Sequence, residues 1–144
     1  MNDLYEGDIL LWSERQADLL RRRAAGELVN EHELDWPNIA EEIEDVGRSE
    51  LRSCRSLLRQ ALRHMVKAEA WPLSRDAPTW RADSIDFRRQ ARDAFAPSMR
   101  QKIDVPGLYA DALAALADSL DGQAPLPVSP CCPFTLDELL SDEP

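Results

Sequence analysis

The sequence is poor in glycine, cysteine and lysine, and it has no long run of apolar residues. Its five glycines are never adjacent, so the chain has no glycine-rich loop of the kind that cradles phosphates. Its three cysteines are an odd number, and Cys131 and Cys132 are neighbours, which makes a regular disulfide framework a poor interpretation. No apolar stretch approaches the ~20 residues that a transmembrane helix needs. We therefore expect a cytoplasmic protein with reduced thiols and no membrane partner.

Acidic residues outnumber basic ones. The 144 residues include 27 aspartates and glutamates against 17 lysines and arginines, for a formal net charge of −10 at pH 7. Nucleic acids and anionic membranes repel such a charge, so neither is expected as the main partner. Because 44% of the residues are hydrophobic, a chain of this length can bury its own core without a metal or disulfides.

Apolar residues recur with helical spacing along most of the chain, and no segment of useful length alternates as a β-strand does. The pattern predicts an all-α, single-domain helical bundle over residues 1–144, organised around one long helix at about 37–69. The stretch 124–134 is rich in proline and is predicted as a loop. Thr135 and Glu138 have the spacing of a capping box, which predicts a short terminal helix. The further helices are expected at residues 4–24, 76–97, 104–122 and 135–141.

The long helix carries acidic residues in its first turns and arginines further on, which is the order that the helix dipole favours. Gly47 falls on the inward side, where it is expected to make room for a bulky neighbour such as Trp12 or Trp36. The arginines carry more positive charge than the nearby acidic residues can neutralise. They therefore form either a solvent-exposed side of the helix or an interaction face for the acidic surface of a second copy. The members of this predicted interaction face are Arg48, Arg52, Arg55 and Arg59. The apolar stripe predicted to face the core consists of Ile39, Ile43, Val46, Cys54, Leu57, Leu58, Ala61 and Met65.

Glu50 falls inside that apolar stripe on a helical wheel. Since an unpaired buried charge is costly, three alternatives stay open for Glu50. It forms an ion pair with a cation such as Arg81 or Arg88 on the next helix or one in the Lys67 region, it is a carboxylate with a functional role, or a bend of the helix exposes it. His64 lies at the edge of the same stripe, about 21 Å along the helix from Glu50. The two are too far apart for acid–base catalysis, and His64 is expected to be a hydrogen-bonded boundary residue.

The acidic run from Glu41 to Asp45 could hold a divalent cation if it met other carboxylates, such as Asp86, across the bundle. This possibility leads to an alternative function, a metal-dependent hydrolase of a phosphorylated small molecule. Against it, the wheel places Glu41 and Asp45 toward solvent, and the sequence has no Glu-x-x-His motif of a di-iron bundle. We therefore predict no metal, no cofactor and no catalytic residue.

Several motifs occur in the order of a known family. Tyr5-Glu6-x-Asp8 is followed by Asn38-Ile-Ala-Glu-Glu-Ile-Glu-Asp-Val-Gly-Arg-Ser-Glu50, then by His64-x-x-Lys67, Trp80 and Cys132-Pro-Phe-Thr135. Across essentially its whole length, the chain resembles the bacterial Domain of Unknown Function 29 family. The resemblance implies an all-helical single domain without a settled activity. The family signature falls on Glu41, Glu42, Gly47, Arg48, Glu50, His64, Lys67 and Trp80.

The sequence as a whole predicts an interaction or regulatory protein without catalysis of its own. Four tryptophans exceed what the core of one small helical domain needs, which favours a protein partner or self-association, a homodimer included. The candidate residues of a functional or structural network are Glu41, Glu42, Glu50, His64, Lys67, Trp80 and Arg81.

Overall fold

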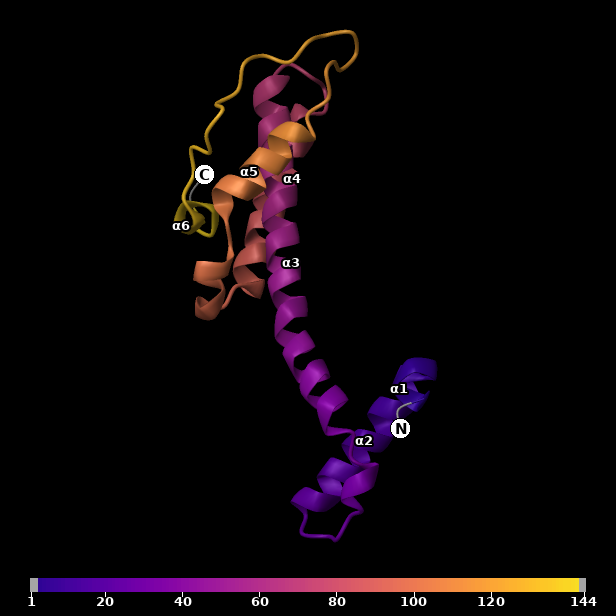
Figure 1. Ribbon diagram of the computed structural model, residues 1–144. Coiled ribbons are helices and arrows are strands. Elements are labelled where there is room, and N and C mark those ends of the chain that lie inside the picture. The colour runs from indigo at the N-terminus through magenta and orange to yellow at the C-terminus, as the bar shows by residue number, and fades with distance from the viewer. Residues whose placement is uncertain (1–2, 143–144) are drawn as a thin grey trace. The chain divides into compact units, whose positions relative to one another are not determined.

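The computed structural model describes residues 3–142, and in this range the chain is helical without a strand (Figure 1). The predicted all-α fold around one long helix is confirmed: α3 extends over Trp36–Ala70. Contacts divide the chain into two compact units, residues 1–48 and 49–144. The boundary lies within α3, so both units share this helix, and the expected single domain over the whole chain stays a prediction.

The N-terminal unit begins with two helices where we expected one over residues 4–24. That prediction is wrong because Asp8 interrupts the helix. The Asp8 carboxylate accepts a hydrogen bond from the backbone N–H of Leu11 at 3.1 Å and caps the second helix, as short polar side chains do at helix starts. The elements of this unit, before the first turns of α3, are α1 (Asp3–Gly7), α2 (Ile9–Ala24) and the 3-10 turn η1 (Glu31–Glu33).

The C-terminal unit packs three further helices and a 3-10 segment against the second part of α3. The helix expected over residues 104–122 is shorter than predicted. It ends eight residues earlier, at Ala114. Further along, Leu120 and Gln123 close a tight turn with two backbone hydrogen bonds of 2.9 Å, in which Asp121 and Gly122 have positive φ angles of 52° and 79°. The elements that follow α3 are α4 (Ala77–Ala94), η2 (Pro97–Lys102), α5 (Val105–Ala114) and α6 (Leu136–Leu139).

The short helix α6 has the predicted capping box. Thr135 Oγ1 accepts from the backbone N–H of Glu138, and the Glu138 carboxylate accepts from that of Thr135, both at 3.2 Å. Leu139 is 1% exposed and belongs to the core. Arg88 of α4 donates to the carbonyl oxygens of Leu139 and Glu138 at 2.9 Å each, so it satisfies acceptors that the end of a helix leaves open.

The apolar stripe predicted along α3 is buried only in part. Ile39 lies in the core of the N-terminal unit, and Leu58 is fully buried in that of the C-terminal unit. Ile43 and Val46, in contrast, are 68% and 67% exposed. A Cβ atom at Gly47 would meet nothing within 4 Å. The expectation that Gly47 makes room for a bulky neighbour is therefore wrong for the described chain.

Candidate functional site

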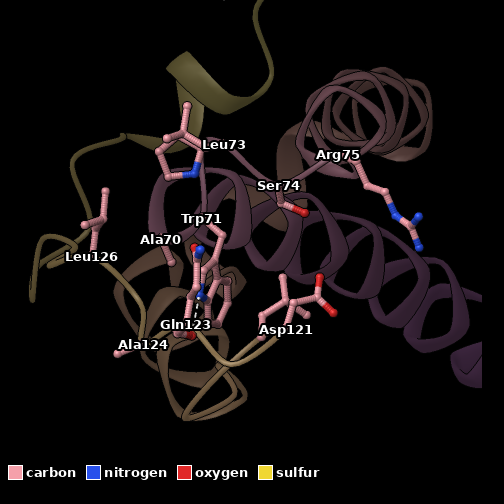
Figure 2. A pocket seen from close by; sticks show the side chains of 11 residues that line it. Ala70, Trp71, Leu73, Ser74, Arg75, Asp121, Gln123, Ala124 and Leu126 are labelled. Carbon is pink, nitrogen blue, oxygen red and sulfur yellow. Dashed lines mark hydrogen bonds between the residues drawn. The ribbon is translucent and has the colours of Figure 1, made fainter.

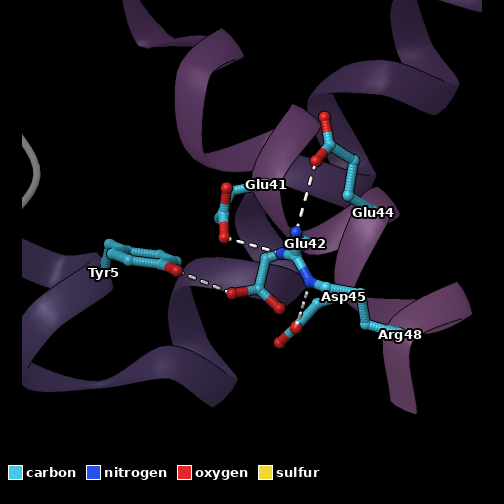
Figure 3. A network of polar contacts seen from close by, with 6 residues as sticks. All are labelled: Tyr5, Glu41, Glu42, Glu44, Asp45 and Arg48. Atoms are coloured by element: carbon cyan, nitrogen blue, oxygen red, sulfur yellow. Dashed lines mark hydrogen bonds and ion pairs between the residues drawn. The ribbon is translucent and has the colours of Figure 1, made fainter. Parts of the chain in front are cut away.

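The acidic run at the start of α3 is organised around one arginine (Figure 3). The Arg48 guanidinium contacts Glu41 at 2.7 Å, Asp45 at 3.2 Å and Glu44 at 3.3 Å. These carboxylates lie seven, three and four residues before Arg48, so helical geometry places them on its side of α3. The hydrogen bond to Asp45 and the charge of Glu41 raise the pKa of Arg48. The arginine thus occupies the position that a cation would have among these carboxylates.

Glu42 does not contact this arginine in Figure 3 but accepts a hydrogen bond from Tyr5. The Tyr5 hydroxyl donates to Glu42 Oε1 at 2.7 Å, and this hydrogen bond is the main cause that raises the pKa of Tyr5 to about 12. The Tyr5 ring meets the edge of Trp12, with centroids 4.9 Å apart and an interplanar angle of 71°. The pair therefore joins α1 to α2 and to α3 within the N-terminal unit.

A buried polar network lies beside these aromatic rings, and the sequence analysis missed it. Asp35 is 7% exposed, and its Oδ2 accepts from Trp12 Nε1 at 2.9 Å and from Asn38 Nδ2 at 2.8 Å. Gln16 Oε1 accepts from the Asp35 backbone N–H at 2.9 Å, while Gln16 Nε2 donates to the Glu33 carbonyl at 3.0 Å. The sequence feature that could have indicated this network is the spacing of Trp12 and Gln16, which places two hydrogen-bonding side chains on one face of α2.

Glu50 is exposed, so its predicted place inside a buried stripe is wrong. The cations that we expected as partners bind elsewhere. Arg81 reaches the Pro72 carbonyl at 3.5 Å, and Arg88 donates to the end of α6. The helical wheel gave a wrong prediction for Glu50 because two apolar residues of the same stripe, Ile43 and Val46, are themselves exposed.

The other candidate residues lie where α3 packs against α4. His64 Nδ1 is 2.9 Å from the Gln60 carbonyl oxygen, and its Nε2 is 3.8 Å from Asp83 Oδ2. The His64 ring also packs against Phe87, with centroids 5.4 Å apart. One turn further along α3, the Lys67 ammonium lies 5.8 Å from the centre of the Trp80 ring, a cation–π distance. These contacts join α3 and α4.

The C-terminal unit also has an open cavity of about 600 Å³ at the end of α3 (Figure 2). The Trp71 side chain lines the cavity. The Trp71 indole N–H donates to the Gln123 carbonyl at 3.1 Å. Arg75 and Asp121 supply its charged groups, and the exposed Leu73 lies at its edge. The residues that line this cavity do not include the paired acid and base that a hydrolytic site would use.

No group of three or more histidine, cysteine, aspartate or glutamate side chains is placed to hold a metal ion among residues 3–142. The carboxylates of the alternative hydrolase do not converge from several helices: Glu41 and Glu44 gather on Arg48, and Glu42 binds Tyr5. Within the same range, no helix has both the length and the apolar character to cross a membrane.

Comparison with known proteins agrees with the fold. The family described as "domain of unknown function DUF29" matches residues 4–143. A crystal structure of an α-helical protein of unknown function from Rhodospirillum rubrum ATCC 11170 is similar, with a TM-score of 0.65 and 29% sequence identity over 99% of this chain and 92% of that chain. No curated protein matches the sequence.

Proposed function

The chain belongs to the DUF29 family, whose function is unknown, and we propose that it is a protein-interaction module without catalysis of its own. The observation that carries this proposal is the surface of the N-terminal unit. Of the ten large hydrophobic side chains that are exposed in the described range, seven lie within residues 1–48. These seven are Ile9, Leu10, Leu11, Leu28, Trp36, Ile43 and Val46.

The N-terminal unit has few buried apolar residues of its own. Among its described residues, Trp12, Leu34 and Ile39 form its buried cluster. A unit of under 50 residues buries a small fraction of its surface and commonly gains stability from a partner. A concentration of exposed apolar side chains on so small a unit supports a role in contact with a partner.

A groove in the N-terminal unit also supports the proposal. It encloses about 800 Å³ between α2 and residues 32–37. Leu11, Leu19 and Leu34 contribute apolar walls, and Arg15 and Asp18 contribute charges of both signs. A groove with apolar walls and charged groups suits a segment of another protein.

The charge of this unit restricts the partner that we propose. Residues 1–48 contain thirteen acidic and five basic side chains, which disfavours nucleic acid and anionic membranes. All three cysteines are free thiols, which supports the cytoplasm as the proposed location.

The test compares two pairs of exposed residues. The tagged full chain, the variant Ile43→Ser/Val46→Ser and the control variant Leu73→Ser/Ile85→Ser are used to capture proteins from an extract of the source cells, with quantification by mass spectrometry. We expect a defined partner that the first variant loses by more than about tenfold and the control retains. Equal capture by all three forms would contradict the proposal.

A further inference from the structure

Two of the three cysteines are neighbours in the loop that precedes α6, where solvent reaches them. Cys131 is exposed and Cys132 is half-buried, whereas Cys54 is fully buried in the core of the C-terminal unit. All three are free thiols. Because the oxidation of a thiol depends on access to its sulfur, the chain has one pair of accessible thiols and a third thiol that the fold protects.

The backbone that carries this pair is anchored to the core. The chain bends at Pro130 and Cys131. Ser129 Oγ donates to the Cys131 carbonyl at 2.6 Å and accepts from the Cys131 backbone N–H at 3.4 Å. The Ser129 carbonyl accepts from the hydroxyl of Tyr109 at 2.6 Å, and Tyr109 belongs to the buried cluster of the C-terminal unit. The loop is therefore held against α5 directly before the two thiols.

The second thiol of the pair has a defined position. The Cys132 thiol donates to the Phe134 carbonyl at 3.3 Å, and the Cys132 side chain packs against the buried cluster. Burial raises the pKa of the Tyr109 hydroxyl, and the charges of Glu69 and of both loop cysteines raise it further. Both thiols are therefore close enough to one core hydroxyl to act on it, and the Cys132 sulfur stays beside Cys131 without leaving the surface of the core.

A bond between two adjacent cysteines is easily reversed. Neighbouring Cα atoms are about 3.8 Å apart, whereas disulfides usually join Cα atoms that are about 4.4–6.8 Å apart. A disulfide that departs from this geometry is strained, and strained disulfides are the ones that cells reduce most readily. The pair is therefore suited to reversible oxidation and not to permanent cross-linking.

We propose that Cys131 and Cys132 form a redox site whose substrate is a hydroperoxide. The Cys131 sulfur attacks one peroxide oxygen, the O–O bond breaks, and the departing oxygen takes the Cys131 proton and leaves as an alcohol or water. Cys131 is then a sulfenic acid. The Cys132 sulfur attacks the Cys131 sulfur, the S–S bond forms, the S–O bond breaks, and the hydroxyl group leaves as water with the Cys132 proton.

The electrons of this reaction balance. The two thiols lose two electrons in total, and the two oxygens of the peroxide gain them. A dithiol reductant restores both thiols by exchange and becomes a disulfide itself. The site lies in the C-terminal unit, so the proposal does not depend on the apolar surface of the proposed function.

Intact-mass spectrometry of the purified full chain tests the site. The reduced chain is treated with hydrogen peroxide, unfolded and alkylated with N-ethylmaleimide. We expect three labelled thiols before oxidation and one after it, on Cys54, with a mass lower by two hydrogens before labelling. Dithiothreitol should restore all three labels. A disulfide that joins two copies, or added oxygen on both sulfurs in place of the bond, would overturn the proposal.

Single substitutions separate the roles of the two thiols. Cys132→Ser removes the thiol that closes the bond, so the Cys131 sulfenic acid should persist and give at least about tenfold more adduct with dimedone than the native chain does. The matched control is Cys54→Ala, which should still lose two labelled thiols on oxidation. Equal dimedone labelling of the native chain and Cys132→Ser would refute the attack of Cys132 on Cys131.

Discussion

Among the described residues, the C-terminal unit buries twelve side chains in one cluster, whereas the buried apolar cluster of the N-terminal unit has three. The smaller unit adds hydrogen bonds to its apolar contacts: Asp35 and Gln16 are buried together with Trp12, the Asp35 carboxylate accepts from the Trp12 indole, and the Asp35 backbone N–H donates to Gln16. The two forms of stabilisation respond differently to substitutions. An apolar core loses stability in proportion to the volume removed, while a buried polar network leaves the remaining partners unsatisfied when one is removed.

The largest effect is expected in the C-terminal unit. Leu62 is fully buried, so Leu62→Ala should lower the free energy of unfolding by about 2–5 kcal/mol. Urea denaturation followed by circular dichroism measures the loss, and amide hydrogen exchange locates it in residues 49–144. Leu73→Ala, at a side chain that is 97% exposed, should change stability by less than about 0.5 kcal/mol. Similar losses for the two variants would show that the cluster does not carry the stability of this unit.

A smaller and more local effect is expected in the N-terminal unit. Asp35→Ala removes the acceptor of Trp12 Nε1 and Asn38 Nδ2, which leaves buried donors unsatisfied at a cost of about 1–3 kcal/mol. Amide exchange should accelerate in residues 9–40 and stay unchanged around α5. The control is Glu33→Ala, which keeps the backbone carbonyl that Gln16 uses. If exchange accelerates equally in both units, the network does not act on the N-terminal unit alone.

The positions of the helices in the C-terminal unit were predicted better than the burial of individual side chains along α3. Helical periodicity identified α3 and α4, because a long apolar stripe repeats many times along each. The capping box of α6 was found from Thr135 and Glu138 because that signal is local. The end of α5 was missed, since Leu116 and Leu120 continue the helical spacing of leucines beyond Ala114, where the helix ends.

The candidate site was harder to predict because a helical wheel shows the direction of a side chain and not what covers it. Ile43, Val46 and Glu50 lie on the same stripe as Leu58, yet only Leu58 is buried. The Arg48 cluster combines contacts at three spacings, and the sequence does not show which of the nearby carboxylates turn toward the arginine. The hydrogen bond from Tyr5 to Glu42 joins residues 37 positions apart, and no local pattern indicates such a contact.

Gly47 offers a larger increase in stability than its exposed neighbours in α3. A Cβ at this position has open space, and alanine is favoured over glycine in a helix interior by about 1 kcal/mol. Gly47→Ala should therefore raise the free energy of unfolding by up to about that amount, measured by urea denaturation at low protein concentration. Ser49→Ala, two residues further along the exposed part of the helix, is the control with a smaller expected gain. A loss of stability on Gly47→Ala would reveal a close neighbour at this position.

The smallest effect concerns the contact between α1 and α3. Because Glu42 raises the pKa of Tyr5 from 10.0 to about 12, the folded chain retains the phenolic proton at a pH where an unfolded tyrosine has lost it. The hydrogen bond therefore contributes its full stabilisation below about pH 10 and loses it as the pH rises toward 12. Tyrosinate absorbance, taken as the difference from Tyr5→Phe to remove the signal of Tyr109, measures the titration. Glu42→Gln should return the pKa of Tyr5 toward its ordinary value, whereas Glu44→Gln, whose carboxylate binds Arg48, should leave it raised. An equal drop in both variants would mean that the general acidity of the helix start, and not the hydrogen bond, holds the proton on Tyr5.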